Sequence, residues 1–290
     1  MMAGRDSFRL CETKAEQVLR EAGITSLPVD PFLIAETQGI VVRAKPSSSP
    51  GVSGMLVQHG DEFGILYATH IQNEGFQRFS VGHELGHFFL DGHIDHVLPL
   101  GQTIHESRSG FVSKDKYELE ADHFSAGLLM PRPLFTRAIA SLSGGLLAIE
   151  TLASVCRTSL TATAIRYTQC GDVPVAVIMT TGQNVDFCFV SQTLFELNGD
   201  IQPLPKGCTI PRATETRRFN EQQNKVERGD RFEGEVGIQD WFGGSGKHLL
   251  REEIIGLGSY GKSLTVLSII DCGSDDDEEE ELEESWTPRF

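Results

Sequence analysis

The chain has 290 residues, of which 39% are hydrophobic and 23% are charged, so a sizeable core is available and wholesale disorder is excluded. Acidic residues outnumber basic ones 41 to 25, and ten of the acids lie in residues 271–290, where the only base is Arg289. A chain with this excess of acidic residues has few clusters of Lys and Arg side chains that could bind phosphate groups. General binding to nucleic acid or to anionic membranes is therefore disfavoured.

The six cysteines are scattered and include no CxxC pair, which excludes a disulfide framework and a zinc ribbon. The first ten residues include charged side chains and no apolar stretch typical of a secretory signal. No segment approaches the roughly 18–20 apolar residues that span a bilayer. We expect a cytoplasmic protein with no membrane association.

The N-terminal part of the sequence predicts alternating short helices and strands. An amphipathic helix is expected over 12–23 and a second one after Pro31, which suits a first helical position. A strand begins at Val41, and the runs 52–57 and 63–68 predict a hairpin.

Two longer helices follow. The first covers roughly 74–91, with an apolar stripe at helical spacing that consists of Val81, Leu85, Phe88 and Phe89. Residues 92–112 are expected to form a loop. The second helix, near 114–130, has Ser113 as its candidate N-cap, and its stripe consists of Tyr117, Ala121, Phe124 and Leu128.

The remaining residues change from helical to β-type patterns. Short helices are predicted near 134–141, 146–156 and 160–169, and the last two have the spacing of a helix-turn-helix. Strands are predicted at 173–179, 185–190, 252–257 and 264–270, with an irregular connection over 204–248. The acidic run at 274–285 predicts a solvated, disordered tail.

The strongest chemical motif is His83-Glu84-Leu85-Gly86-His87, an HExxH sequence within the first long helix. Four residues make about one helical turn, so His83 and His87 project from the same face and can both reach one zinc ion. Glu84 lies beside them, where its carboxylate can hold the attacking water as a general base.

A zinc site needs a third protein ligand, and the next helix supplies a candidate. Glu118 and Asp122 are spaced at i, i+4, which predicts Glu118 as the ligand and Asp122 as the acceptor for a histidine N–H. Glu120 points about 200° away from Glu118 and is expected to be solvated. Because this ligand set accepts either ion, Zn2+ is predicted and Mn2+ is an alternative.

Other polar residues have less defined roles. His93, His96, His105 and His123 lie close to the motif in sequence but are expected to be ordinary loop or packing residues. Hydrolysis of an amide also requires a group that stabilises the oxyanion. Tyr67, Tyr117 and His123 are candidates that the sequence does not rank.

Residues 78–90, with the HExxH motif, and 118–131, with Glu118 and Asp122, resemble the ImmA/IrrE family of zinc metallopeptidases. The resemblance covers about residues 10–135. It implies a gluzincin-like peptidase core in which His83, His87 and Glu118 bind zinc and Glu84 is catalytic. The sequence departs from the family at Asp122, where many members have Asn, and at Ser125 and Gly127, where Ala is common.

Members of this family cleave helix-turn-helix transcriptional repressors in stress responses and mobile-element induction. The resemblance thus implies an α+β chain with a peptidase domain at 1–135, built on a small antiparallel sheet and the HExxH helix. A helix-turn-helix-like segment at 136–170, a mixed α/β GAF-like domain at 171–272 and the acidic tail at 273–290 would follow. The expected function is zinc-dependent cleavage of a protein substrate, in particular such a repressor.

Two other readings stay open. The chain can be a DNA-binding regulator with a structural or degenerate metal site, although the helices at 146–169 offer only Arg157 and Arg166 as bases, so we expect at most weak DNA binding. Alternatively, the C-terminal domain senses a small-molecule or protein effector and controls the peptidase.

If the chain is a peptidase, an extended segment of the substrate is expected to add as a strand to the hairpin edge near 64–70.

Overall fold

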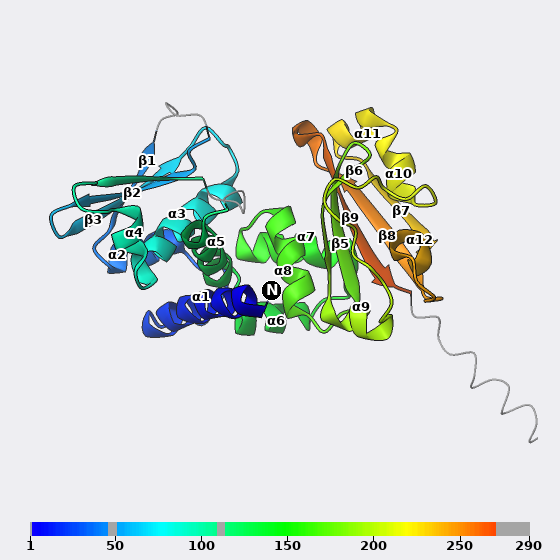
Figure 1. The fold of residues 1–290 in the computed structure, drawn as a ribbon, viewed down its shortest axis with the longest axis horizontal. Helices are drawn as coiled ribbons and strands as arrows, with labels where there is room; N and C mark the ends of the chain where they lie inside the picture. The colour runs from blue at the N-terminus through cyan, green and yellow to red at the C-terminus, as the bar shows by residue number, and fades with distance from the viewer. Residues whose placement is uncertain (1, 46–50, 109–113, 271–290) are drawn as a thin grey trace, which may run out of the picture. The chain divides into compact units, whose positions relative to one another are not determined.

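The computed structural model describes residues 2–45, 51–108 and 114–270, with side chains from Ser7 onward. The acidic tail and Ser113 lie outside the described residues. The chain separates into two compact units, residues 1–172 and 173–290 (Figure 1). Both helices and sheets are present, as predicted for an α+β protein, and each unit has a sheet of its own.

The first unit contains eight helices and four strands among its described residues. Its helices are α1 (Met2–Glu21), α2 (Pro31–Thr37), α3 (Glu74–Phe89), α4 (His93–Val97), α5 (Lys116–Leu129), α6 (Arg132–Ile139), α7 (Gly145–Cys156) and α8 (Leu160–Cys170). Its strands are β1 (Val41–Lys45), β2 (Gly54–His59), β3 (Glu62–Ala68) and β4 (Ile104–Ser107). The predicted loop over 92–112 was therefore wrong, because it contains both α4 and β4.

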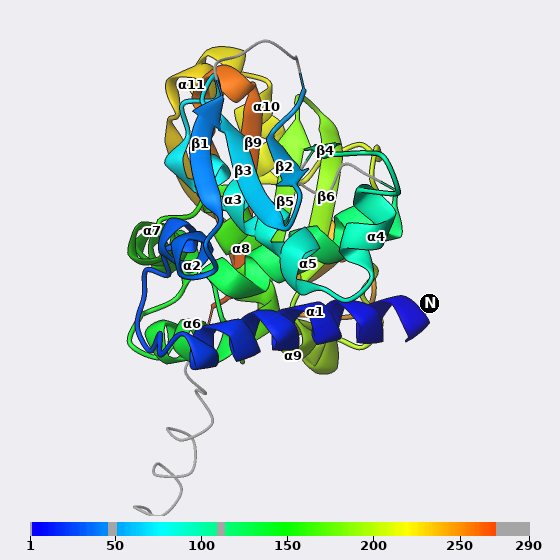
Figure 2. The same ribbon diagram turned by 90° about the vertical axis from the view of Figure 1, so that its left-hand side faces the viewer.

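The sheet of this unit has the strand order β1-β3-β2-β4 (Figure 2). The predicted hairpin is confirmed: β2 and β3 pair antiparallel, with His59 opposite Glu62 and Gly60 at φ 62° in the turn. The sheet is mixed rather than antiparallel, since β1 runs parallel to β3. Strand β3 is paired on both sides, so the expected docking edge near 64–70 was wrong, and the edges belong to β1 and β4.

The HExxH helix α3 is buried over 78–87, and it crosses α5 closely. A Cβ added at Gly86 would lie 3.0 Å from the Cα of Ala121, and one at Gly82 would lie 2.5 Å from the Oγ of Ser125. The two glycines thus allow the backbones to approach. This crossing brings the histidines of α3 to the carboxylates of α5.

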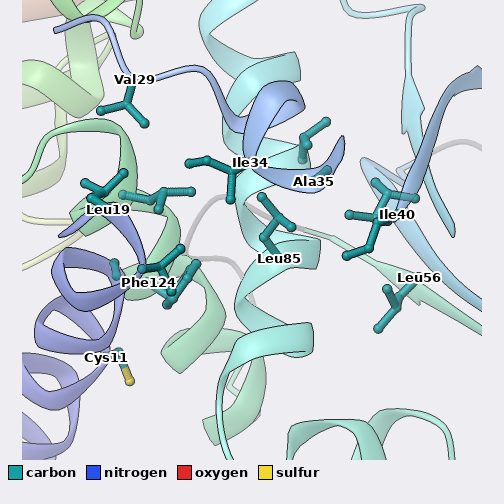
Figure 3. Packing of buried hydrophobic residues seen from close by; sticks show 14 of the residues in the cluster. Cys11, Leu19, Val29, Ile34, Ala35, Ile40, Leu56, Leu85 and Phe124 are labelled. Atoms are coloured by element: carbon teal, nitrogen blue, oxygen red, sulfur yellow. The ribbon is translucent and has the colours of Figure 1, made fainter. Parts of the chain in front are cut away.

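A hydrophobic cluster fixes α3 against its neighbours. Val81 and Leu85, from the predicted stripe, pack with α2 and β2, and Phe124 of α5 joins the same cluster (Figure 3). Helix α1 also packs against α5 and contributes Leu19 to the same cluster. Because α5 packs against both α3 and α1, two of its faces are buried, which bears on Glu120 below.

Helices α6, α7 and α8 agree with the three short helices predicted at 134–169. Helices α7 and α8 are joined at Arg157, whose φ of 54° is left-handed. Ser159 caps α8 by accepting from the backbone N–H of Ala162. Six residues of α8 are buried, among them Arg166 and Tyr167.

The second unit is a five-stranded antiparallel sheet in the order β6-β5-β9-β8-β7. Its strands are β5 (Val175–Thr181), β6 (Asn184–Val190), β7 (Arg231–Gly237), β8 (Leu249–Gly256) and β9 (Lys262–Ile269). Its helices are α9 (Gln192–Leu197), α10 (Glu215–Asn220), α11 (Gln223–Arg228) and α12 (Ile238–Phe242), with a 3-10 turn at Gly258–Tyr260. The predicted irregular connection over 204–248 was wrong, since it contains α10, α11, β7 and α12.

None of the described helices combines the length and apolar character that crossing a membrane requires.

Candidate metal centre

The two motif histidines are held side by side by α3. Asn73 caps the helix by accepting from the N–H of Phe76, and His83 and His87 follow one turn apart, both 0% exposed. Their Nε2 atoms lie 3.1 Å apart. Two imidazoles therefore present the same nitrogen to a common point.

Glu118 completes a triad with these histidines, as predicted. Its Oε2 lies 3.4 Å from His83 Nε2, and its Oε1 lies 3.3 Å from His87 Nε2. A tetrahedral ion with bonds of about 2.0–2.1 Å has ligand atoms about 3.3–3.4 Å apart. The two histidine nitrogens lie 3.1 Å apart, and each lies 3.3–3.4 Å from a different oxygen of Glu118, which is close to this edge length. One ligand atom from each of the three residues lies within 4.8 Å of the others, so the residues fit a zinc ion.

Asp122 contacts the other nitrogen of His83, at 2.8 Å from Nδ1. This contact places a proton on Nδ1, which leaves the Nε2 lone pair for a metal. Although burial opposes it, the carboxylates of Asp122 and Glu118 raise the pKa of His83 to about 10 when no metal is bound. A metal ion must then displace a proton from His83.

Glu84 is fully buried beside the triad, and glycine on β2 makes room for it. A Cβ at Gly54 would overlap the Glu84 carboxylate. Burial raises the pKa of Glu84 to about 7, against the lowering effect of neighbouring His83 and the Ser107 hydroxyl. A carboxylate with a pKa near neutrality is suited to accept and return a proton.

His105 is a site residue that the sequence analysis missed. It comes from β4, and its Nε2 lies 2.9 Å from Glu118 Oε1. His105 and Glu118 also line a cleft of about 310 Å³, which continues past Val97, Pro99 and Gln102. The triad is thus reached from a cleft with a histidine at its edge.

His93 and Glu120 also belong to the site. His93 Nδ1 lies 3.1 Å from His87 Nδ1, and its Nε2 lies 3.3 Å from Glu120 Oε2. The expectation that Glu120 is solvated was wrong, because the residue is 7% exposed. Glu120 faces His93 and α1, and these cover the side of α5 on which solvent was expected.

The three oxyanion candidates have other contacts among the described side chains. Tyr67 packs edge-on against Phe32 at 5.3 Å, Tyr117 stacks on His96 at 3.8 Å, and His123 stacks on Phe8 at 4.0 Å. Their catalytic roles stay predictions.

The bases of the helix-turn-helix-like segment are engaged within the first unit. Arg166 is 1% exposed; its Nη1 lies 2.9 Å from a carboxylate oxygen of Glu12, and its Nε donates to the carbonyl of Met130. Arg157 forms an ion pair with Glu74. These two side chains are not arranged as a basic surface for DNA phosphates.

Comparison with known proteins supports the peptidase family for the first unit. None of the curated proteins matches the chain. The chain has the fold of a solved structure described as a Mycobacterium tuberculosis transcriptional regulator, with a TM-score of 0.58 and 16% identity over 92% of this chain and 81% of that one. Residues 35–168, which contain every ligand of the triad, match the family Peptidase_M78, described as the IrrE N-terminal-like domain, and thereby support the ImmA/IrrE family.

Proposed function

We propose that this chain is a zinc-dependent endopeptidase. The observation that carries the proposal is the triad, in which the Nε2 atoms of His83 and His87 lie 3.1 Å apart and each lies 3.3–3.4 Å from an oxygen of Glu118, beside the buried Glu84. The match of residues 35–168 to a peptidase family supports the same chemistry.

His83, His87 and Glu118 would hold the zinc ion, which would supply Lewis-acid chemistry by polarising the scissile carbonyl and lowering the pKa of water. Glu84 takes the proton of the attacking water and delivers it to the leaving amine. His105, at the edge of the cleft, donates a hydrogen bond from Nε2 to the developing oxyanion. His105 thereby joins Tyr67, Tyr117 and His123 as a candidate, and its Nε2, which lies 2.9 Å from Glu118 Oε1, would have to turn from Glu118 to the oxyanion.

We propose that β4 is the docking edge for an extended segment of the substrate. Gln58 N–H donates to the carbonyl of Thr103, so the alternation of the ladder turns the N–H groups of Ile104 and Glu106 away from β2. The edge carries His105 between them, next to the cleft. Glu106→Pro removes one outward N–H and should raise KM with zinc content unchanged, and an unchanged KM would contradict this docking.

The proposed substrate is a helix-turn-helix transcriptional repressor, cleaved to induce a stress response or mobile-element genes. This substrate class rests on the family resemblance and on the match of residues 35–168. The second unit, with its antiparallel sheet and short helices, is proposed as the GAF-like part that binds an effector. Cytoplasmic location is part of the same proposal.

The test is to incubate zinc-loaded protein with an extract of the source cells and to label new protein N-termini. The proposal predicts new termini with the wild type and none with Glu84→Gln. Equal sets of termini with both proteins would contradict it.

A transcriptional regulator is the second candidate, favoured by the fold shared with the Mycobacterium tuberculosis regulator. It predicts binding of duplex DNA with a steep dependence on salt. The buried state of Arg166 and the ion pair of Arg157 weigh against the helices α7 and α8 as the binding surface.

A further inference from the structure

The two histidines of the triad are supported in different ways. His83 contacts a carboxylate directly, since its Nδ1 lies 2.8 Å from Asp122. Among the described residues, His87 contacts no carboxylate through Nδ1. Instead its Nδ1 faces a third histidine, His93, whose far nitrogen lies 3.3 Å from Glu120.

The local chain geometry brings His93 back over His87. Helix α3 ends at Phe89 with Leu90 as its C-cap, and Gly92 adopts a φ of 76° before α4 begins. A side chain at this position would be strained, so glycine permits the reversal. His93 is consequently 2% exposed and lies edge-on to Tyr117 at 5.0 Å.

The hydrogen bonds that link His87, His93 and Glu120 all run in one direction when His87 binds a metal. His87 must keep the Nε2 lone pair, so its proton is on Nδ1 and is donated to His93 Nδ1. His93 then carries its own proton on Nε2 and donates it to Glu120. Ser7 donates its hydroxyl to the other oxygen of Glu120, and the ammonium of Lys116 lies 3.5 Å from that oxygen.

We propose that His93 and Glu120 are positioning residues, which fix the ring and tautomer of His87 so that its Nε2 faces the metal. This inference rests on the proposed zinc function. A carboxylate that acts through a ligand histidine raises the basicity of that ligand, and loss of such a partner lowers metal affinity by about 10–100-fold. Here an inserted imidazole transmits the effect.

The structure distinguishes this role from simple packing. Glu120 is a buried acid on α5. One of its oxygens contacts Ser7 of α1 and Lys116 of α5, and the other contacts His93, so the carboxylate is held against the histidine. His96, three residues after His93, is 45% exposed in its side chain and contacts Asp115 and Tyr117. It lines the cleft beside Glu118, but no hydrogen bond joins it to His87 or Glu120 among the described residues. His96 therefore supplies a matched control on the same helix.

The experiment measures the zinc dissociation constant of the full-length protein by competition with a chromophoric chelator, for the wild type, four single variants and one double variant. His93→Phe retains an aromatic ring and loses both hydrogen bonds. His93→Gln retains an acceptor for His87 and a donor for Glu120. Glu120→Gln removes the charge with little change of shape, and His96→Phe is the control.

The inference predicts that His93→Phe weakens zinc binding about 10–100-fold, with smaller losses in His93→Gln and Glu120→Gln and none in His96→Phe. The His93→Gln variant should therefore bind zinc more tightly than the His93→Phe variant. If His93 acted through packing alone, the aromatic replacement would preserve zinc affinity better. In the combination of His93→Phe with Glu120→Gln, the losses should not add, because both act through one chain.

Two results would overturn the inference. Equal affinity in wild type, His93→Phe and Glu120→Gln would show that the chain does not act on His87, while the zinc proposal would stand. If His93→Phe does not fold, Glu120→Gln alone decides, and full affinity in that variant contradicts the inference. A wild type without zinc affinity would instead contradict the proposed function itself.

Discussion

Each unit of the molecule buries a glutamate, and the difference between the two shows what separates a site from a structural network. In the second unit, Glu252 is 0% exposed and its oxygens accept from the backbone N–H groups of Glu215 and Thr216 and from the Thr216 hydroxyl. These donors come from the first turn of α10, and Thr216 also contacts Thr265. Both carboxylate oxygens of Glu252 are thereby satisfied by hydrogen bonds within the second unit.

In the first unit the buried polar groups are arranged differently. The Nδ1 atoms of His83 and His87 are engaged, yet their Nε2 atoms and Glu118 converge on one point. Glu84 lies against Gly54, and in the part of the chain that the structure describes the Ser107 hydroxyl is the donor that acts on its carboxylate. Buried polar groups are ordinarily paired with one another. Lone pairs aimed at a common point therefore indicate a ligand, whereas the satisfied oxygens of Glu252 indicate a fold-stabilising role.

The largest expected effect of this difference is on catalysis. Glu84→Gln should lower the rate of peptide hydrolysis by about 10²–10⁴-fold, because the attacking water loses its general base. Zinc content should stay at the wild-type level, since Glu84 is not a ligand. Cleavage of the substrate found by terminal labelling measures the rate, and a loss of less than about tenfold would contradict the role.

Gly54→Ala should have a smaller effect on the same reaction. The added Cβ overlaps the Glu84 carboxylate and must displace it. We expect kcat to fall by up to about 10²-fold, the loss that a misplacement of about 1 Å can produce, with zinc affinity unchanged. As a matched control, Gly64→Ala on β3 meets only the Val41 carbonyl at 3.5 Å and should retain kcat.

The second unit should respond in stability alone. Glu252→Ala leaves the N–H groups of Glu215 and Thr216 without their acceptor, at a cost of about 1–3 kcal/mol. Zinc affinity should not change. Denaturant unfolding and chelator competition on the same protein measure the two quantities, and a zinc affinity that falls with the stability would contradict the separation.

The smallest effect concerns the stability of the zinc-free protein. Burial raises the pKa of Glu84 from 4.5 to about 7 in the folded state. Folding therefore binds a proton between these values, and the contribution of Glu84 to stability is greatest below pH 4.5 and is lost as the pH rises to 7. At pH 8, Glu84→Gln should raise the Tm of the zinc-free protein by a few degrees, and an unchanged or lower Tm would contradict the buried charge.

The part of the site that lies on helices could be predicted from the sequence. The i, i+4 spacing of His83 and His87 and the helix predicted near 114–130 place the triad once α3 crosses α5. The N-cap of α5 is Asp115, whereas Ser113 was the predicted candidate. His93 and His105 could not be predicted in this way. Their positions depend on α4 and β4, two elements of five and four residues that are too short to show a period.

The errors in the fold have the same origin. Helices α10, α11 and α12 have five or six residues each, so a search for helical periodicity finds only a charged, glycine-rich stretch. Glu120 was misplaced because helical geometry gives the angle from Glu118 but not the neighbour on the far side. Helix α1 begins at Met2, ten residues before the predicted start, and its Ser7 reaches Glu120.

Metal content is the most direct test of the central claim, measured by elemental analysis after purification without chelators. The account predicts about one zinc ion per wild-type chain and its near-complete loss in Glu118→Gln, with both proteins folded by circular dichroism. Zinc retained in Glu118→Gln, or a wild type that takes up no zinc even when the ion is supplied, would contradict the assignment of His83, His87 and Glu118 as a metal centre.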